Sequence, residues 1–346
     1  MLTPWDALYL ERALELAKRA APPAVEPNPP VGAVIAVGEE VLGEGYHAYF
    51  GGPHAEIVAL ESVQKPELLP QATLYVTLEP CCHTGKKTPP CVPALINAGI
   101  RRVVIGTRDP NPAVHGAGIQ ALRAAGVEVL LAPDPRPFRS LLRHFWVHVR
   151  HERPYITLKW AQTPGHPSGG ILGHRTQGLW PISGFWGRVW GHRLRTRHSH
   201  IAVGYRTWLL DQPRLTARLW PGPSPRPLVF YDPRRGKPTL PEPFLGLPLE
   251  TINKDFLQSL YRDHRVSSLL VEGGSRLLQQ FLAAGWYDEV QVLVSYEAPL
   301  PPPEAIVWAP AWPPLKWKRR RLSPTEEVWI ARPPTKGPHL PQKPAP

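Results

Sequence analysis

The stretch from His54 to Cys91 constrains this chain more than any other, because it contains metal-binding side chains in a fixed order. His54-Ala55-Glu56 comes first, Pro80-Cys81 follows after room for a helix and a strand, and Pro90-Cys91 ends the stretch. One imidazole and two thiolates suit a zinc ion, and three protein ligands leave a fourth tetrahedral position open for water, as in catalytic sites. We therefore predict a zinc site with the ligands His54, Cys81 and Cys91.

Glu56 lies two residues after the predicted histidine ligand and is not itself needed as a ligand. Zinc lowers the pKa of a bound water from about 15.7 to about 7, and a nearby carboxylate can then carry the water's proton. His-x-Glu followed by Pro-Cys and a later cysteine is typical of the zinc-dependent deaminases of nucleobases and nucleotides. The pattern predicts hydrolytic removal of an exocyclic amine, with Glu56 as the catalytic proton carrier.

The three cysteines of the chain all lie within this stretch, which makes the pattern more specific than any of its parts. We interpret Cys81 as the ligand because it directly follows Pro80, and this leaves Cys82 as a surplus thiol. The alternative is a closed structural zinc site in which His83 supplies the fourth ligand.

Cysteines used for metal binding rather than disulfides favour a reducing compartment, so we expect a cytoplasmic protein.

The formal net charge of +12 comes entirely from the second half of the chain. Residues 1–150 carry 14 basic and 14 acidic side chains, whereas the remainder carries 26 and 14. A chain of 346 residues suits two domains, and the charge asymmetry supports a boundary near residue 150. The basic excess favours an anionic partner, either a phosphorylated small molecule or a nucleic acid. No apolar run approaches the length of a membrane span, so no membrane partner is expected.

Helical and strand patterns alternate along the first half, and the candidate chemistry falls at strand ends and helix starts. A helix beginning at Pro53 would carry His54 and Glu56 in its first turn, and a strand over 73–78 would end just before Cys81. This arrangement predicts an α/β domain of three layers. The other expected helices are 3–20, 93–98, 119–125 and 135–149, and the other expected strands are 31–37, 41–46, 102–105 and 127–131.

Six segments of the first half match a known family. They are Pro27-Asn28-Pro29-Pro30-Val31-Gly32, Gly45-Tyr46-His47, Pro53-His54-Ala55-Glu56, Thr77-Leu78-Glu79-Pro80-Cys81, Thr88-Pro89-Pro90-Cys91 and Arg108-Asp109-Pro110-Asn111-Pro112. Residues 1–150 thereby resemble the deaminase domain of the bifunctional riboflavin-biosynthesis deaminase/reductase, which has a cytidine-deaminase-like fold. The resemblance implies deamination of 2,5-diamino-6-ribosylamino-4(3H)-pyrimidinone 5′-phosphate. It implies pyrimidine and ribose contacts from Asn28, His47, His83, Asp109 and Asn111, and a phosphate contact from either Lys86 or Lys87.

The second half also alternates between strands and helices, which again predicts an α/β domain. The expected strands are 154–159, 200–203, 228–231, 268–271 and 289–295, and the expected helices are 188–197, 256–261 and 275–284. Residues 162–184 are rich in glycine and proline and are predicted to form a long loop. The basic run at 316–321 is interpreted as the exposed face of a late strand rather than a nucleic-acid contact. The proline-rich residues 333–346 are predicted to be a disordered tail.

Five segments of the second half match the other domain of the same family. They are Pro154-Tyr155-Ile156-Thr157-Leu158-Lys159, Leu194-Arg195, Val203-Gly204, Asp211-Gln212-Pro213-Arg214-Leu215-Thr216 and Val271-Glu272-Gly273-Gly274-Ser275. Residues 151–332 thereby resemble its reductase domain, which has a dihydrofolate-reductase-like α/β fold and uses NADPH to open the ribose to a ribityl chain. The resemblance implies a catalytic Lys159. It implies substrate contacts from Arg195, Leu215, Arg218 and Glu272, and cofactor contacts from Trp180, Thr207, Asp211, Gly274 and Ser275.

Three segments of the second half depart from the family pattern, so alternatives stay open. Gln162-Thr163-Pro164-Gly165 replaces Ser-Leu-Asp-Gly, the segment around Trp180 is altered, and Ala298-Pro299-Leu300 is incomplete. The second half is therefore either an active reductase or a reductase-like module without activity. A nucleic-acid deaminase of the tRNA type with a basic accessory domain would explain the charge, but not the segment from Asp109 to Pro112. Association into a homo-oligomer is implied by family analogy alone.

Overall fold

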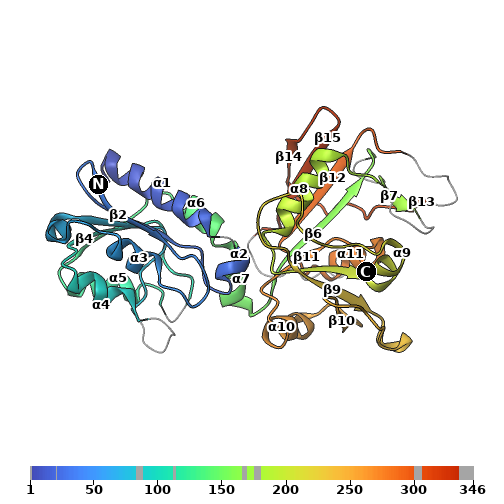
Figure 1. Ribbon diagram of the computed structural model, residues 1–346, viewed down its shortest axis with the longest axis horizontal. Coiled ribbons are helices and arrows are strands. Elements are labelled where there is room, and N and C mark those ends of the chain that lie inside the picture. Colours follow the sequence, from blue (N-terminus) through green and yellow to red (C-terminus); the bar gives the residue numbers. More distant parts are fainter. Residues whose placement is uncertain are drawn as a thin grey trace, which may run out of the picture. The chain divides into compact units, whose positions relative to one another are not determined.

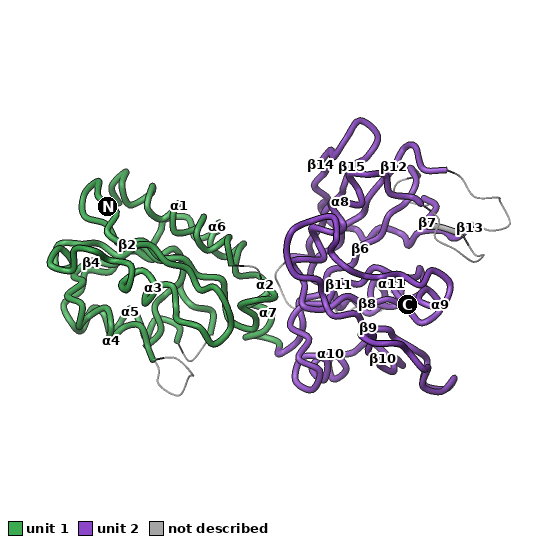
Figure 2. Tube along the Cα trace, in the orientation of Figure 1, with its two compact units in different colours: residues 1–151 green, residues 152–346 purple. Residues whose placement is uncertain are grey.

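The computed structural model describes residues 2–20, 22–82, 89–111, 114–165, 170–174, 181–299 and 306–334. The chain divides into two compact units, Met1–His151 and Glu152–Pro346, which Figure 2 shows in different colours. The division lies one residue past the boundary expected near residue 150. Four of the predicted site residues, and the expected tail from residue 335 onward, lie outside the described residues. The four are His83, Lys86, Lys87 and Trp180.

Unit 1 is built on a five-stranded sheet with the order β2-β1-β3-β4-β5. β1 is antiparallel to both of its neighbours, whereas β3, β4 and β5 run parallel. The strands are β1 (Gly32–Val37), β2 (Glu40–Tyr46), β3 (Thr73–Val76), β4 (Arg102–Ile105) and β5 (Glu128–Leu131). The helices are α1 (Pro4–Arg19), α2 (Pro22–Val25), α3 (Ala55–Glu61), α4 (Cys91–Asn97), α5 (Ala117–Ala124), α6 (Arg136–Leu141) and α7 (Arg143–His151), with a 3-10 turn η1 (Pro66–Gln71).

Helices cover both faces of this sheet, so the predicted three-layer α/β architecture is confirmed. α1 and α6 lie over one face, and α3, α4 and α5 lie over the other (Figure 1). Alternation along the strands explains the two faces, because successive side chains of a strand point to opposite sides. In β1, Val34 and Ala36 pack with α1, whereas Ala33 and Ile35 pack with α3, α4 and α5.

Unit 2 is built on an eight-stranded mixed sheet with the order β10-β9-β8-β11-β6-β12-β15-β14. The six strands from β10 to β12 in this order are parallel, and the last two pairings are antiparallel. The strands are β6 (Tyr155–Gln162), β8 (His200–Gly204), β9 (Arg226–Tyr231), β10 (Leu245–Pro248), β11 (Ser268–Val271), β12 (Glu289–Ser295), β14 (Trp317–Arg321) and β15 (Glu326–Ala331). The helices are α8 (Phe185–Arg195), α9 (Tyr205–Asp211), α10 (Lys254–Arg262) and α11 (Ser275–Ala284), with a 3-10 turn η2 (Pro233–Arg235).

Two hydrophobic clusters show that unit 2 is also layered. One contains α10 and α11 with one face of the sheet, and the other contains Leu194 of α8 with Ile201, Val229 and Leu270 of the opposite face. Within β6, Leu158 and Trp160 belong to the first cluster, so the intervening Lys159 points to the face that α8 covers. This alternation directs a lysine of a central strand to the α8 side of the sheet.

The prediction of a long loop over 162–184 was wrong in part. β7 (Ile171–His174) lies inside it and pairs antiparallel with β13 (Ile306–Trp308), a strand more than 130 residues further along the chain. Sequence patterning did not predict this ribbon because strands of four and three residues are too short to give a periodic signal. The interpretation of residues 316–321 as an exposed late strand is confirmed, since β14 is an edge strand whose residues 318–321 are exposed.

Candidate active sites

The three predicted zinc ligands come together in unit 1. The Nδ1 atom of His54 lies 3.1 Å from the Cys91 Sγ and 3.5 Å from the Cys81 Sγ, and the two sulfurs are 3.8 Å apart. Zinc–sulfur bonds of about 2.3 Å and zinc–nitrogen bonds of about 2.0 Å in a tetrahedron require S–S and N–S separations of about 3.8 and 3.5 Å. Two of the three observed separations match these values closely, so the donor set fits a zinc ion.

Helix starts position two of the three ligands. His54 is the N-cap of α3, and Cys91 is the first residue of α4. Cys81 follows β3 by five residues, and its carbonyl oxygen accepts a hydrogen bond from the Val92 amide. The positive end of a helix dipole favours a thiolate. Hydrogen bonds from Cys91 and His54 outweigh burial and lower the pKa of the Cys81 thiol, which favours the ionised form that a metal requires.

Glu56 lies in the first turn of α3, is 4% exposed, and lines the same cavity as His54 and Cys81. Burial raises the pKa of its carboxyl group, and the nearby His54 opposes this effect. A raised pKa makes the ionised carboxylate a stronger base than an exposed one, as a proton carrier requires. The structure therefore places the predicted proton carrier beside the predicted metal ligands.

Asn28 and His47 form a hydrogen-bonded pair on the wall of this cavity. The His47 Nδ1 lies 2.9 Å from the Pro53 carbonyl oxygen, and this contact requires an N–H at Nδ1. Nε2 is then the acceptor for the Asn28 side-chain amide at 3.1 Å. Burial lowers the pKa of His47, which keeps this neutral tautomer in place. The pairing fixes the Asn28 amide so that its oxygen is an acceptor for a ligand N–H.

Asp109 and Asn111 lie on a loop that Glu79 holds in place. The Asn111 amide donates to the Asp109 Oδ1 at 2.7 Å, and both residues line the cavity. The carboxylate of Glu79 is 3% exposed and accepts hydrogen bonds from the amides of Asp109, Gly116 and Ile119. Sequence analysis quoted Glu79 only as part of a motif. Its position directly before Pro80-Cys81 indicates that one side chain links the metal-ligand segment to the Asp109 loop.

The cavity of unit 1 has a volume of about 390 Å³, which is in the range for a small-molecule site. It collects seven of the predicted residues, and Cys91 lies buried behind its wall. The seven are Asn28, His47, His54, Glu56, Cys81, Asp109 and Asn111. Sequence analysis missed Phe50 and Phe145, which also line it.

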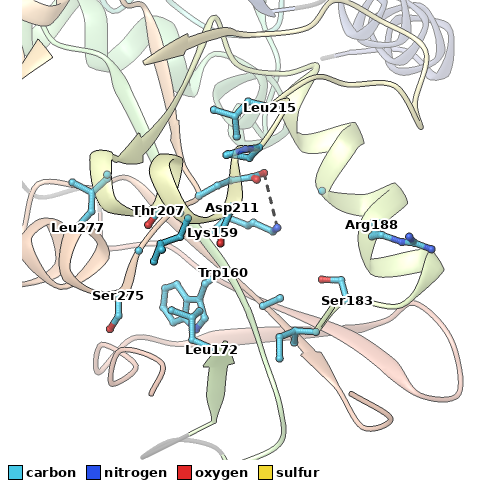
Figure 3. Close-up of a pocket in the computed structure, with 18 of the residues that line it drawn as sticks. Lys159, Trp160, Leu172, Ser183, Arg188, Thr207, Asp211, Leu215, Ser275 and Leu277 are labelled. Carbon is cyan, nitrogen blue, oxygen red and sulfur yellow. Dashed lines mark ion pairs between the residues drawn. The ribbon is translucent and has the colours of Figure 1, made fainter. Parts of the chain in front are cut away.

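Unit 2 has a larger cavity of about 780 Å³ at the carboxyl ends of its parallel strands, where open α/β sheets bind ligands. Figure 3 shows how Lys159, Thr207, Asp211, Leu215 and Ser275 approach it from different elements. All nine predicted residues of this half that the structure describes line the cavity. They are Lys159, Arg195, Thr207, Asp211, Leu215, Arg218, Glu272, Gly274 and Ser275.

A buried ionic cluster forms the polar centre of this cavity. Glu272 accepts two hydrogen bonds from the Arg195 guanidinium, at 2.5 and 3.1 Å, and lies 3.9 Å from the Lys159 Nζ. Burial raises the pKa of Glu272, but Arg195 and Lys159 outweigh it and lower the pKa to about 2. Burial also lowers the pKa of Lys159, and Glu272 partly offsets this effect. The cluster therefore holds a lysine whose proton is released more readily than usual.

His192 of α8 also lines the cavity, and sequence analysis gave it no role. Its Nδ1 accepts the Leu219 amide at 3.3 Å, which ties α8 to the segment that carries Arg218. Burial, with help from Arg195 and Arg218, lowers the pKa of His192 to about 4, so the ring is neutral at pH 7. His192 precedes Arg195 by three residues, and residues so spaced share one helix face. This spacing is the feature of the sequence that could have identified His192 as a residue of the site.

The described cofactor residues come from α9 and from the start of α11, which lie close together. Thr207 and Asp211 are four residues apart on α9, so they share one face. Gly274 precedes α11 and has a φ of +66°, and a Cβ atom there would lie 2.7 Å from the Thr207 Oγ1. Glycine is therefore required at this position by both conformation and space.

Leu215, in contrast, adopts a φ of +53° despite its side chain, a strained geometry that is typical of functional sites.

Comparisons with known proteins assign both units. The family model described as "Cytidine and deoxycytidylate deaminase zinc-binding region" matches residues 3–107, and that of the "RibD C-terminal domain" matches residues 247–295. Riboflavin biosynthesis protein RibD of Aquifex aeolicus is 36% identical over 85% of this chain and 88% of its own length. The Bacillus amyloliquefaciens protein of the same name is 33% identical and covers 85% of both chains.

Two solved structures share the whole architecture. A deaminase/reductase from Thermotoga maritima superposes with a TM-score of 0.75 at 33% identity, covering 95% of this chain and 98% of its own. Acinetobacter baumannii RibD, form 1, gives a TM-score of 0.77 at 28% identity, with coverages of 95% and 99%.

Fold, site and comparisons define a zinc-binding deaminase unit followed by a reductase unit. The chain belongs to the RibD family of riboflavin-biosynthesis proteins, which combine deaminase and reductase activities. The predicted family and fold class are thereby confirmed. Among the described residues no helix is long and apolar enough to cross a membrane. A cytoplasmic location and a homo-oligomeric state stay predictions.

Proposed function

We propose that unit 1 deaminates 2,5-diamino-6-ribosylamino-4(3H)-pyrimidinone 5′-phosphate, and that unit 2 then reduces the ribose of the product with NADPH. The name of the Thermotoga maritima relative, a diaminohydroxyphosphoribosylaminopyrimidine deaminase and 5-amino-6-(5-phosphoribosylamino)uracil reductase, describes both steps. The observation that carries the proposal is the convergence of predicted residues in two cavities, each with its own reactive centre.

In the deaminase step, water replaces the exocyclic amine of the pyrimidine, so that C–NH₂ and H₂O become C=O and NH₃. A zinc ion held by His54, Cys81 and Cys91 would supply an acidic water at neutral pH. Glu56 would carry the two protons of this water in turn, the first to the ring nitrogen and the second to the leaving amine. The fixed Asn28 oxygen accepts a substrate N–H, while Asp109 and Asn111 bind the rest of the ring and the ribose.

His83, and Lys86 or Lys87, complete the proposed substrate site of unit 1. They stand between Cys81 and Cys91 in the sequence, and the resemblance assigns the phosphate to one of the two lysines. All three lie outside the described residues, so their contribution stays a proposal.

In the reductase step, the C1′–ring oxygen bond of the ribose breaks and a hydride is added to C1′. NADPH, when bound, supplies the hydride, and one proton must reach the released ring oxygen. Lys159 is the proton donor in this proposal, because its lowered pKa makes it a stronger acid than an exposed lysine. Glu272 and Arg195 orient it and, with Leu215 and Arg218, bind the substrate.

The charge of the unit 2 cavity suits phosphorylated ligands. Six arginines line it, and guanidinium groups bind phosphate through paired hydrogen bonds. Thr207, Asp211, Gly274 and Ser275 would contact NADPH, and Trp180 would join them from outside the described residues. This cavity thus accounts for part of the basic excess without a nucleic acid. The six arginines that line the cavity are Arg188, Arg195, Arg206, Arg214, Arg218 and Arg276.

The test is to incubate zinc-loaded protein with the diaminopyrimidinone phosphate and to follow ammonia release and NADPH oxidation together. We expect both signals in the wild type. Glu56→Ala should retain zinc but release no ammonia, and Lys159→Met should release ammonia without oxidising NADPH.

Ammonia release without NADPH oxidation in the wild type would support the alternative of a reductase-like module without activity. Full deamination by a zinc-loaded Glu56→Ala variant would refute the proposed role of that residue.

A further inference from the structure

His192 is a buried histidine on the wall of the unit 2 cavity, and the proposed reduction does not use it. It is 5% exposed, lies in the last turn of α8, and lines the cavity together with Lys159, Arg195 and Arg218. The helix comes close to the reactive lysine at this point, because a Cβ atom at Gly191 would lie 3.5 Å from the Lys159 Nζ. His192 is therefore a polar side chain directly beside the centre of the site.

The main chain determines which nitrogen of the His192 ring carries the proton. Nδ1 accepts a hydrogen bond from the Leu219 amide at 3.3 Å, and an accepting nitrogen carries no proton. Burial, with help from Arg195 and Arg218, lowers the pKa of His192 to about 4, so the ring is neutral at pH 7. The one proton of the neutral ring is then on Nε2, and moving it to Nδ1 would break the contact with Leu219. Nε2 is thus held as a hydrogen-bond donor.

This donor is open to the cavity. Nε2 has no hydrogen-bond partner among the described residues, and it is not one of their fully enclosed polar atoms. The two ring nitrogens lie on different edges of the ring, so Nε2 points away from Leu219. Since the side chain lines the cavity, a ligand can reach this N–H group.

The segment that carries Arg218 is held against α8 at two points. One is the contact of the Leu219 amide with His192, and the other is a hydrogen bond of 2.8 Å from the Arg195 Nη1 to the Thr216 carbonyl oxygen. Arg218 lies between these two points and is exposed, with its Nη1 3.4 Å from the Thr216 Oγ1. The distance between the His192 ring and the backbone of Arg218 is therefore set before any ligand binds.

The charges around His192 suit an anionic group. After burial, the largest influences on the pKa of His192 are the charges of Arg195 and Arg218, which lower it, whereas Glu272 opposes them. Positive charge thus predominates at this part of the wall, as a phosphate requires. A neutral N–H donor adds a hydrogen bond to an anion without adding to the repulsion among the cations, and a hydrogen bond to an ionised acceptor is about twice as strong as a neutral one.

We propose that the Nε2–H group of His192 donates a hydrogen bond to the phosphate of the unit 2 substrate, beside the guanidinium group of Arg218. This inference rests on the proposed reductase function for the class of substrate, a phosphorylated ribose, and it adds a contact that the sequence motifs do not contain. The 5′-phosphate is remote from C1′, where the hydride is added. The hydrogen bond is therefore expected in both the ground state and the transition state, so it acts mainly on KM rather than on kcat.

The experiment compares His192→Asn with His192→Gln in the full-length, zinc-loaded protein. The asparagine side chain can still accept the Leu219 amide but is too short to replace Nε2, whereas the glutamine side chain can place an N–H donor near the position of Nε2. His264→Ala is the control, since His264 is an exposed histidine of unit 2 outside the lining of the cavity. The first readout is NADPH oxidation with 5-amino-6-(5-phosphoribosylamino)uracil. The second is the Kd of ribose 5-phosphate by calorimetry, with ribose for comparison.

His192→Asn should raise both the KM of this substrate and the Kd of ribose 5-phosphate by about 10- to 150-fold, with little change in kcat. His192→Gln should retain most of the affinity, and His264→Ala should behave as the wild type. Ammonia release by unit 1 should be unchanged in all three variants. The thermal unfolding midpoint, measured for each variant, excludes loss of the fold.

A His192→Asn variant with the wild-type KM and Kd would overturn the inference, because the contact with Leu219 would then be the only role of the side chain. A His192→Gln variant as impaired as His192→Asn would overturn it too, and so would ribose 5-phosphate that binds the wild type no better than ribose. A wild type that does not oxidise NADPH with this substrate would refute the proposed reductase function, and the Kd of ribose 5-phosphate would still decide the phosphate contact.

Discussion

Replacing Glu272 by glutamine removes a buried negative charge from the centre of the unit 2 cavity. Among the described side chains of this cluster, Glu272 carries the only negative charge, whereas Lys159 and Arg195 are cations. The shape of the side chain is retained, so packing changes little. Its side chain is 7% exposed, and the side chains of Arg195 and Lys159 are 14% and 13% exposed. Two cations then face each other with little solvent to screen them, and breaking a buried ion pair in this way is strongly destabilising.

The magnitude follows from the pKa of Glu272. Arg195 and Lys159 outweigh the effect of burial and lower this pKa from 4.5 to about 2. Each pKa unit corresponds to about 1.36 kcal/mol, so the ionised carboxylate contributes roughly 3 kcal/mol at neutral pH. Because the folded-state pKa is lowered, this contribution is complete well above pH 4.5 and is lost as the pH falls toward 2. By about pH 3 less than half of it should be left.

Tryptophan fluorescence during urea unfolding can measure this effect, because 11 of the 13 tryptophans lie in residues 152–346 and therefore report on unit 2. We expect Glu272→Gln to lower the free energy of unfolding of unit 2 by roughly 3 kcal/mol at pH 7, and by much less at pH 3. Glu250→Gln is the matched control, since Glu250 is an exposed carboxylate of the same unit. Ammonia release by unit 1 should be unaffected.

Two results would refute this reasoning. A Glu272→Gln variant as stable as Glu250→Gln at pH 7 would mean that the ion pairs contribute nothing net. A loss of stability that is the same at pH 7 and pH 3 would mean that the effect arises from the altered hydrogen bonds rather than from the charge.

Two further predictions concern unit 1. Glu79→Gln replaces one of the two carboxylate oxygens that accept hydrogen bonds from backbone amides of the Asp109 loop and α5. We therefore expect KM for deamination to rise about 5-fold with zinc content unchanged. The control Glu61→Gln, on the exposed end of α3, should have no effect. Asp6→Asn removes the fully buried negative charge that pairs with Arg102, whose guanidinium lowers the pKa of Asp6. We expect the free energy of unfolding of unit 1 to fall by about 3 kcal/mol. The urea concentration that halves ammonia release should fall accordingly. An unchanged KM or an unchanged urea midpoint would contradict the respective prediction.

The sequence was sufficient to predict the metal site because its constraints are local. His54, Cys81 and Cys91 are the chain's candidate soft ligands in a spacing that places two of them at helix starts, and the structure brings them within 4.8 Å of one another. The layers of unit 1 were also predictable, since its strands alternate between two cores in the expected period. Local periodicity and ligand chemistry together fixed these features.

The centre of the reductase cavity was less predictable because its residues meet only through the fold. Lys159, Arg195 and Glu272 are separated by 36 and 77 positions in the sequence, and no local pattern reports that they form one ion cluster. Phe50 was missed for a related reason. An exposed phenylalanine in a turn carries no signal until the structure shows that it lines a cavity.

The structure also bears on the departures from the family pattern in the second half. Gln162, in the segment that lacks the expected acid, is 1% exposed and accepts hydrogen bonds from the indole N–H groups of Trp160 and Trp312. Its polar group is therefore used inside the core of unit 2, not at the ionic centre of the cavity. Lys159 lies three residues earlier, on the opposite face of β6 from the apolar Leu158, and keeps its contact with Glu272. The acid of the family pattern would stand at Pro164, and Lys159, Arg195 and Glu272 keep their mutual contacts without it. The proposed proton donor is therefore in place, which favours an active reductase over a module without activity.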